Sequence, residues 1–210
     1  MKNFSPTKVI VVINAVIFIG LPSILGDEKY QELLYKLFFY SEVEGEPWRW
    51  FTHMFLHKNM NHLLFNSIAL WGFGLGLEQY VSKKKYLFLY LLSGLTGLAL
   101  QYSFRSDPFG ALGASGCISG VIGAICYLQP NQKLLLFFVI PLKMKWAFPL
   151  IIVISLAMKF TDTLSGVGHL AHVGGLICGY LLAKFIIQKP QQIFFSEEDI
   201  QEIRSNHEQP

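Results

Sequence analysis

The sequence predicts an all-α, polytopic membrane protein with six transmembrane helices, and three observations carry that prediction. Of the 210 residues, 52% are hydrophobic and only 15% are charged, which is not the composition of a soluble domain. The apolar residues fall in long blocks, many of them close to the roughly 20 residues that a helix needs to cross a bilayer. Lysines and arginines gather in every second connection between the blocks, as the positive-inside rule expects of cytoplasmic loops.

Six helical segments account for the apolar blocks. No small-residue cleavage site follows the first block, so it is predicted to be a span and not a signal peptide. The predicted spans are 9–25, 59–78, 86–104, 115–128, 146–160 and 169–187. They form a membrane domain of residues 1–187, which a polar and acidic cytoplasmic tail, 188–210, follows. Both termini are expected on the cytoplasmic side of the cell (plasma or inner) membrane.

Two of the connections between spans carry their own predictions. The connection from Gly26 to Leu56 holds apolar residues at helical spacing among charges, beginning at Tyr30, and this pattern predicts a helix lying at the membrane interface. The apolar run from Leu134 to Ile140 is too short to cross a bilayer. We expect it at the interface or in a partly buried connection.

Charge and cysteine usage exclude several function classes. The net charge of +3 is small and spread over loops, which gives no case for nucleic acid binding. Cys117, Cys126 and Cys178 lie within apolar segments, are odd in number and lack metal spacing, so they are expected to be small core residues. No cofactor or metal is predicted. Membrane lipid is the expected environment of the chain.

A single hydroxyl stands where a glycine-rich approach becomes the fourth span, in Gly113-Ala114-Ser115-Gly116. Glycine lets the backbone turn sharply and lets other groups approach closely. Such a serine could be a nucleophile whose oxyanion is stabilised by N–H groups at the helix start. The same four residues are also typical of a small-residue contact between membrane helices, and the motif alone favours that contact.

The predicted topology assigns a depth to each polar residue in the spans. His62 and Asn66 fall in the outer half of the second span, Ser115 at the outer end of the fourth, and His172 one turn below the outer end of the sixth. The fourth span, 115–128, is only about 21 Å long against a hydrocarbon core of about 30 Å. Ser115 is therefore predicted about 9 Å below the outer surface, beside a water-filled cavity, because irregular backbone at that depth must pack in protein or meet water.

Each of these polar residues has a structural and a functional interpretation. His172 could pack between helices, but intramembrane ionisable residues are functional by default, and a neutral imidazole is a competent base for a serine. His62 and Asn66, four residues apart, could bond each other or donate to an oxyanion. Metal binding by His57, His62 and His172 is a weaker alternative, since no carboxylate is suitably spaced beside them.

Glycines on the fourth and sixth spans predict how the helices meet. Gly116, Gly175 and Gly179 give both helices a smooth face, with Gly120 and Gly123 extending it on the fourth span. Close approach of these faces would bring Ser115 and His172 within hydrogen-bond reach. Asp107 and Asp162, on the outer side, could orient His172, but we expect both to be solvated loop residues.

The joint pattern resembles a rhomboid intramembrane serine protease of the bacterial six-transmembrane type. The likeness runs from about Trp48 to Ala183. The motifs that carry it are Trp48-Arg49, His57, His62-Leu63-Leu64-Phe65-Asn66, Gly74 with Glu78, Gly113-Ala114-Ser115-Gly116, and Ala171-His172 followed by Gly175 and Gly179.

This resemblance implies roles for individual residues. Ser115 would be the nucleophile and His172 its general base and acid, without a third acidic member. The oxyanion group would be His62, Asn66 and the backbone N–H of Ser115, with Gly113 beside them. Trp48 and Arg49 would be structural in the first loop, His57 would lie near the site, and Glu78 would pin the inner end of the second span. Ser119 departs from the pattern, because many relatives have there an aromatic side chain that packs on the histidine.

The resemblance also implies the partners. Substrates of the family are single-span membrane proteins, cleaved within or near the transmembrane segment. One alternative is a non-proteolytic rhomboid-like protein that binds membrane clients, but such relatives lack the serine or the histidine, and this chain has both. Another is a small-molecule transporter, for which paired inverted repeats and a charged site at mid-depth are missing from the sequence.

Overall fold

Helices make up most of the protein in a computed structural model that describes residues 4–104, 107–136, 140–161 and 168–187. The elements in chain order are α1 (Pro6–Ala15), the π-helical turn η1 (Val16–Gly20), α2 (Leu21–Leu25), α3 (Asp27–Leu37), β1 (Phe39–Tyr40), α4 (Arg49–Thr52), the 3-10 turn η2 (His53–Phe55), α5 (Met60–Ala69), the π-helical turn η3 (Leu70–Gly74), α6 (Leu75–Glu78), α7 (Lys83–Ser103), β2 (Gly110–Ala111), α8 (Ser115–Leu128), β3 (Lys133–Leu136), β4 (Ile140–Lys143), α9 (Met144–Phe160) and α10 (His169–Ile186).

Serine and asparagine caps decide where three of the helices begin. The first helix begins at Pro6 and not at Val9, because the Ser5 hydroxyl accepts a hydrogen bond from the Lys8 N–H at 3.2 Å and proline suits the first helical position. Ser82 caps α7 in the same way, so that helix begins before the predicted residue 86. Asn59 caps α5. The fourth helix has the predicted bounds, 115–128.

Two small antiparallel sheets make the all-α prediction incomplete. β1 pairs with β2, placing Phe39 opposite Ala111. β3 and β4 pair as a hairpin, with Lys133 opposite Lys143 at its base. The apolar run from Leu134 to Ile140, expected as an interfacial or partly buried connection, thus belongs to strands over its described residues. Strand pairing satisfies the backbone groups of a segment that is too short to be a transmembrane helix.

The length and apolar composition of the described helices test the membrane prediction in part. Among the described residues, two helices are long and apolar enough to cross a bilayer, Pro6–Leu25 and His169–Ile186. Ser115–Leu128 is apolar but shorter. The count of six spans and the orientation of the termini stay predictions. The predicted tail, 188–210, lies outside the described residues.

A carboxylate joins the first two long helices at one end of the bundle. Oε1 of Glu78 accepts hydrogen bonds from the Ser5 hydroxyl and the Thr7 N–H, each at 2.7 Å. Thr7 then donates from its hydroxyl to the Tyr86 hydroxyl at 2.9 Å. A Cβ on Gly74 would lie 2.6 Å from both of those hydroxyl oxygens, so glycine is what lets α1 and α7 meet there. Glu78 therefore ties the end of α6 to the start of α1.

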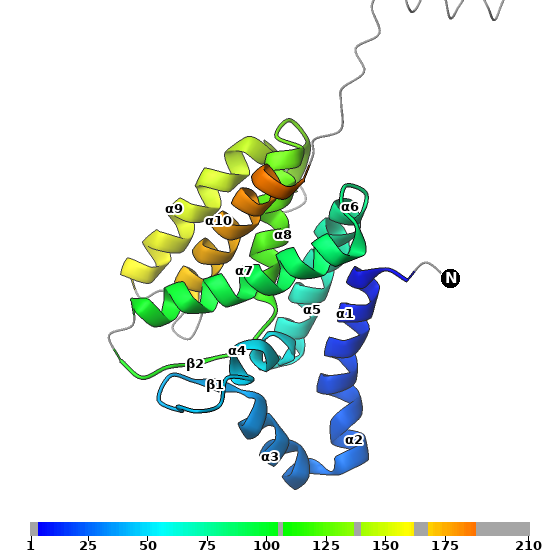
Figure 1. The fold of residues 1–210 in the computed structure, drawn as a ribbon, viewed down its shortest axis with the longest axis vertical. Coiled ribbons are helices and arrows are strands. Elements are labelled where there is room, and N and C mark those ends of the chain that lie inside the picture. Colours follow the sequence, from blue (N-terminus) through cyan, green and yellow to red (C-terminus); the bar gives the residue numbers. More distant parts are fainter. Residues whose placement is uncertain (1–3, 105–106, 137–139, 162–167, 188–210) are drawn as a thin grey trace, which may run out of the picture.

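The two ends of the bundle differ in what they contain. At one end, Nζ of Lys85 donates to the carbonyl oxygen of Ile186 at 2.7 Å, which joins the start of α7 to the end of α10. Figure 1 shows α2, α3, α4 and the paired β1 and β2 at the opposite end. The long connection and the glycine-rich approach to α8 therefore meet on one side, and the lysine-rich connection lies on the other.

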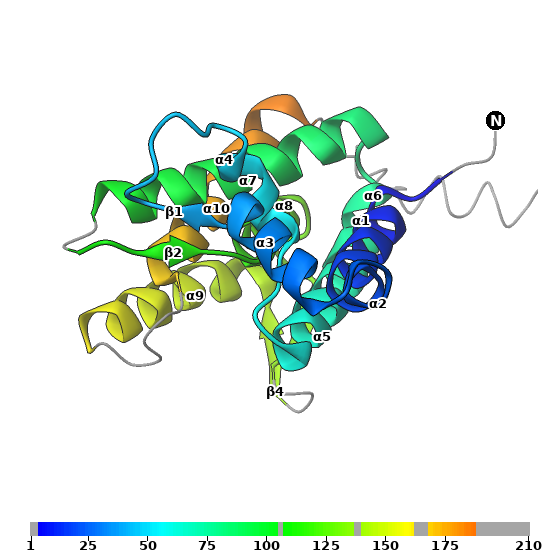
Figure 2. The same ribbon diagram turned by 90° about the horizontal axis from the view of Figure 1, so that it is seen from below.

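The core is centred on α8, of which ten of 14 residues are buried. Figures 1 and 2 show this helix between α5 on one side and α9 and α10 on the other. Cys117 and Cys126 are buried free thiols and Cys178 is half-buried, which agrees with their prediction as small core residues. A helix surrounded on this scale can hold a polar group away from bulk solvent.

Glycines bring the backbones of α8 and α10 into direct contact. A Cβ on Gly175 would overlap the carbonyl oxygen of Gly116, and a Cβ on Gly179 would overlap the carbonyl oxygen of Gly120. Gly123 faces the α10 backbone in the same manner. Only glycine permits helix axes to approach so closely. The predicted smooth faces are confirmed, and they set the distance between the two helices.

We predict that Gly179→Ala destabilises the protein, because the added methyl group meets backbone that cannot move without separating α8 from α10. Overpacking of this kind costs about 1–3 kcal/mol. Gly72→Ala is the matched control, since a Cβ there has nothing within 4 Å and alanine favours the helix. Thermal unfolding of both variants in detergent measures the difference. Equal melting temperatures for the two variants would contradict the packing argument.

Candidate active site

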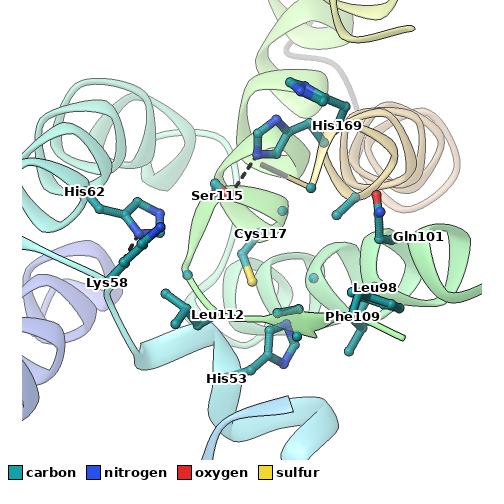
Figure 3. A pocket seen from close by; sticks show the side chains of 18 of the residues that line it. His53, Lys58, His62, Leu98, Gln101, Phe109, Leu112, Ser115, Cys117 and His169 are labelled. Atoms are coloured by element: carbon teal, nitrogen blue, oxygen red, sulfur yellow. Dashed lines mark hydrogen bonds between the residues drawn. The ribbon is translucent and has the colours of Figure 1, made fainter. Parts of the chain in front are cut away.

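A cavity of about 920 Å³ lies at the end of the bundle that holds β1 and β2, and the predicted site residues line it. Figure 3 shows His62 on one side of the cavity and Gln101 and Phe109 on the other, with Ser115 between them. The structure places together in this lining Ser115, His172, His62, Asn66, Gly113 and Gly116. The sequence therefore identified the central residues of the cavity.

The contact between Ser115 and His172 is the central feature of the cavity. Nε2 of His172 lies 2.9 Å from Oγ of Ser115, although the residues are 57 positions apart. Ser115 is the first residue of α8, and His172 lies one turn into α10, where its N–H donates to the Gly168 carbonyl oxygen at 3.1 Å. A hydroxyl within hydrogen-bond reach of an imidazole is the arrangement that activates a serine nucleophile.

Gly113 gives the approach to Ser115 its shape. Its φ of 119° is favourable only for glycine, and a Cβ would lie 2.7 Å from Cε1 and 2.8 Å from Nε2 of His62. Its N–H donates to the carbonyl oxygen of His53 at 2.9 Å. The expected place of Gly113 among the oxyanion groups is therefore corrected: its hydrogen bond is already used, and it contributes space for the His62 ring.

The hydrogen bonds around His62 indicate which ring nitrogen carries the proton. The Lys58 N–H points at Nδ1 of His62 at 3.4 Å, so Nδ1 acts as the acceptor. A neutral imidazole with an acceptor at Nδ1 has its proton on Nε2. Nε2 is also the atom that lies against Gly113. The ring therefore presents an N–H donor to the space beside Ser115.

Asn66 supplies a second donor on the same side. Its side chain is 8% exposed, and its amide nitrogen Nδ2 has no hydrogen-bond partner within the described part of the chain. Nδ2 lies 3.8 Å from the position that a Cβ on Gly113 would take. A buried donor left without a partner costs about 1–3 kcal/mol. Such a cost is expected of a donor that is held in position for a negative charge that develops only in the transition state.

His57 supports the site from behind and does not line the cavity. Its ring is 6% exposed and packs edge-on against the His62 ring, with 5.1 Å between the ring centroids. Burial, with a smaller contribution from nearby His62, lowers the pKa of His57 to about 4. The imidazole is therefore neutral at physiological pH. Its location agrees with the expected place near the site.

Trp48 and Arg49 hold the first loop together. Arg49 is 3% exposed, pairs with Glu46, and donates from Nη1 to the carbonyl oxygens of Tyr35 and Phe38. Trp48 donates from its indole N–H to the carbonyl oxygen of Lys36 at 3.1 Å. Both side chains thereby satisfy carbonyl groups at the end of α3. These contacts connect the first loop to the end of α3, where both residues were expected to be structural.

Several cavity residues escaped the sequence prediction. Oε1 of Gln101 accepts the Leu170 N–H at 3.1 Å and so satisfies a donor at the start of α10. The His169 ring lies 6.4 Å from the His172 ring, centroid to centroid, and perpendicular to it. A glutamine near the C-terminal end of α7 and a second histidine one turn before His172 were the available signals. Ser119, in contrast, does not line the cavity.

The remaining candidates do not join the site. Asp107 is exposed and does not line the cavity, and Asp162 lies outside the described residues. Across the described ranges, no three His, Cys, Asp or Glu side chains lie together so that they could hold a metal ion.

Comparison with known proteins agrees with this geometry. Residues 44–189 match the Rhomboid domain, which is more than half of the chain. The chain belongs to the rhomboid family. It is 33% identical over 142 residues to the rhomboid protease GluP of Bacillus subtilis and 30% identical over 189 residues to the rhomboid protease GlpG of Haemophilus influenzae.

These rhomboid relatives differ in length. The alignment with GluP covers 67% of this chain but only 26% of GluP, so the chain spans about a quarter of that protein. The alignment with GlpG covers 86% of this chain and 93% of GlpG. A third relative, the putative rhomboid protease YdcA of Bacillus subtilis, is 30% identical over 71% of this chain and 72% of its own length.

The lowered pKa of His57 predicts a pH dependence of stability. Because the folded state holds this histidine neutral, the unfolded chain binds more protons between pH 6.5 and pH 4. The contribution of His57 to the free energy of unfolding is fully present above pH 6.5. It is lost as the pH falls toward 4, which lowers the free energy of unfolding by about 2 kcal/mol after allowance for solvent screening. Thermal unfolding across this pH range measures the effect. His57→Gln should show a shallower slope, and an unchanged slope would rule out this histidine as the source.

Proposed function

We propose that the protein is an intramembrane serine endopeptidase that cleaves single-span membrane proteins within or near their transmembrane segment. The observation that carries the proposal is the 2.9 Å contact between Nε2 of His172 and Oγ of Ser115 inside a cavity lined with donors. Membership of the rhomboid family supports it. The dyad is intact here, which distinguishes the chain from rhomboid-like proteins that bind membrane clients without cleaving them.

In the acylation step, Oγ of Ser115 attacks the carbonyl carbon of the scissile peptide bond. Its proton passes to Nε2 of His172, which lies within hydrogen-bond reach and acts as the general base. A tetrahedral oxyanion forms. As the intermediate collapses, His172 returns the proton to the leaving amine, and the substrate's N-terminal part remains as an ester on Ser115.

Three donors are placed to stabilise the oxyanion. They are the Nε2–H of His62, the Nδ2–H of Asn66 and the backbone N–H of Ser115. As the first residue of α8, Ser115 has no acceptor for its N–H within the helix. Preorganised donors of this kind act most strongly where water is excluded. In the deacylation step a water molecule, activated by His172, hydrolyses the ester and restores the free serine.

The membrane setting of this reaction follows the predicted topology. Six spans with both termini in the cytoplasm place the cavity toward the outer leaflet of the plasma or inner membrane. The partners are single-span transmembrane substrates and the surrounding lipid, and the chemistry requires no metal or cofactor. A peptide bond inside a helix is shielded from attack, so substrates are expected to be locally unwound at the cleavage point.

The dyad predicts two inactive variants. Ser115→Ala and His172→Ala should each abolish cleavage of a single-span substrate by the purified protein, because one removes the nucleophile and the other its base. Ser103→Ala is the matched control: this serine is exposed, and among the described residues its hydroxyl bonds only to the carbonyl oxygen of Ala99 in its own helix. Gel assays report cleavage, and a fluorophosphonate probe reports covalent labelling of Ser115. Cleavage that survives in Ser115→Ala would refute the nucleophile assignment.

The oxyanion role predicts a graded effect at Asn66. Asn66→Ala should lower kcat by about 10²-fold, the usual scale for one lost donor, with little change in KM. Asn66→Asp, which is close in size but replaces the donor with an acceptor, should be at least as slow. Steady-state kinetics with a fluorogenic single-span substrate separate kcat from KM. An unchanged kcat in Asn66→Ala would remove this amide from the mechanism.

A further inference from the structure

The cavity around Ser115 carries charge of one sign. Two lysines and four histidines line it, and the described lining contains neither aspartate nor glutamate. The basic side chains are His53, Lys58, His62, Lys159, His169 and His172. The histidines belong to the catalytic chemistry or the structure around it. The two lysines, Lys58 and Lys159, have no part in the proposed reaction, so their place in the cavity needs a separate explanation.

Lys58 is fixed close to the oxyanion donors. It lies just before α5, and its N–H donates to Nδ1 of His62. Figure 3 shows it beside His62, on one side of Ser115. A lysine side chain carries its charge on a flexible four-carbon stem. Its ammonium group is therefore tethered beside the space that a substrate's scissile bond must enter.

Lys159 approaches from the other side. It lies in the last turn of α9, a helix that packs against α10, which carries His172. Figures 1 and 2 both place α9 and α5 on opposite sides of α8. The ion pairs of the described residues, Lys36–Glu32 and Arg49–Glu46, include neither cavity lysine. Two lysines without a carboxylate partner in the described chain thus line the cavity that holds Ser115 and His172.

We infer that the cavity selects substrates that carry an acidic side chain within a few residues of the scissile bond, and that Lys58 and Lys159 determine this specificity. The inference rests on the proposed protease function, whose substrate class it narrows. A carboxylate entering the cavity meets complementary charge in surroundings of lower dielectric than water. A lysine or arginine at the same substrate position meets repulsion. Discrimination of this kind combines an attraction with a penalty for the wrong partner.

The competing role for these lysines is anchoring. Lysines near helix ends extend their ammonium groups to the lipid headgroups while their stems pack on apolar surface. An anchoring lysine would leave substrate choice unchanged when neutralised. The two roles therefore differ in one measurable property, which is the dependence of binding on the charge of the substrate.

The test measures binding with the full-length Ser115→Ala protein in detergent, so that it does not depend on turnover. The probes are three single-span peptides that are identical except for Asp, Asn or Lys two residues from the cleavage point. We expect Asp to bind about threefold to fivefold tighter than Asn, the scale of an exposed ion pair, and Lys to bind weakest. Raising the salt from about 50 mM to about 500 mM should shrink the advantage of Asp.

Variants in the same background assign the effect to the two lysines. Lys58→Gln and Lys159→Gln should each reduce the preference for Asp, and the double variant should remove it. Lys159→Glu should reverse the ranking of the Asp and Lys peptides. Lys36→Gln is the control, because this exposed lysine pairs with Glu32 and does not line the cavity. A circular-dichroism melt of each variant verifies that the fold is retained.

Each outcome bears on the inference. Equal affinity for all three peptides, no binding of any of them, or a preference for Asp that persists in the double glutamine variant would overturn it, and the last result would assign the lysines to lipid anchoring. A cleavage assay with the wild-type protein distinguishes a failure of the charge specificity from a failure of the proposed protease function. Charge-blind binding with cleavage refutes only the specificity. Charge-selective binding without cleavage refutes the protease and leaves the specificity of the cavity standing.

Discussion

The backbone contact between α8 and α10 is the constraint on which the rest of the site depends. Glycines at 116, 120, 175 and 179 leave no side chain between these helices, so carbonyl oxygens of one meet the Cα atoms of the other. Ser115 begins one helix and His172 lies one turn into the other. The 2.9 Å hydrogen bond between their side chains therefore follows from the glycine-mediated packing of α8 against α10. A flexible loop could not hold two side chains at that separation with the same accuracy.

The rest of the site is organised around one open space beside Ser115. Gly113 turns the chain with a positive φ and leaves room for the His62 ring, while its own N–H is held by His53. The Lys58 N–H points at Nδ1 of His62, which puts the ring proton on Nε2, and the amide nitrogen of Asn66 has no hydrogen-bond partner among the described residues. Buried donors without partners are costly in a stable protein. The Asn66 amide and the His62 ring both lie beside Gly113, which supports the proposal that they stabilise a negative charge formed there during the reaction.

Much of this could be predicted because the physical signal was local. The bounds 115–128 follow from glycines before the helix and Gln129-Pro130 after it. Ser115, His172, His62 and Asn66 were expected at one depth from counting spans, and the structure brings them to one cavity, while the depth itself stays a prediction. The start of the first helix at Pro6 was missed because the Ser5 cap outweighed the apolar pattern. The pairing of β1 with β2 was missed because two-residue strands 71 positions apart have no local signature.

The sequence by itself determined the class of protein, the helical segments and the identity of the residues at the site, because composition, apolar block length and motif spacing act along the chain. Only the tertiary structure decided that Gly113 cannot donate to an oxyanion, that His62 carries its proton on Nε2, and that Lys58 and Lys159 face the same cavity. Those facts depend on which atoms meet across helices. Hydrogen-bond partners and the charge of a shared cavity are properties of the folded arrangement, and no single segment of the sequence contains them.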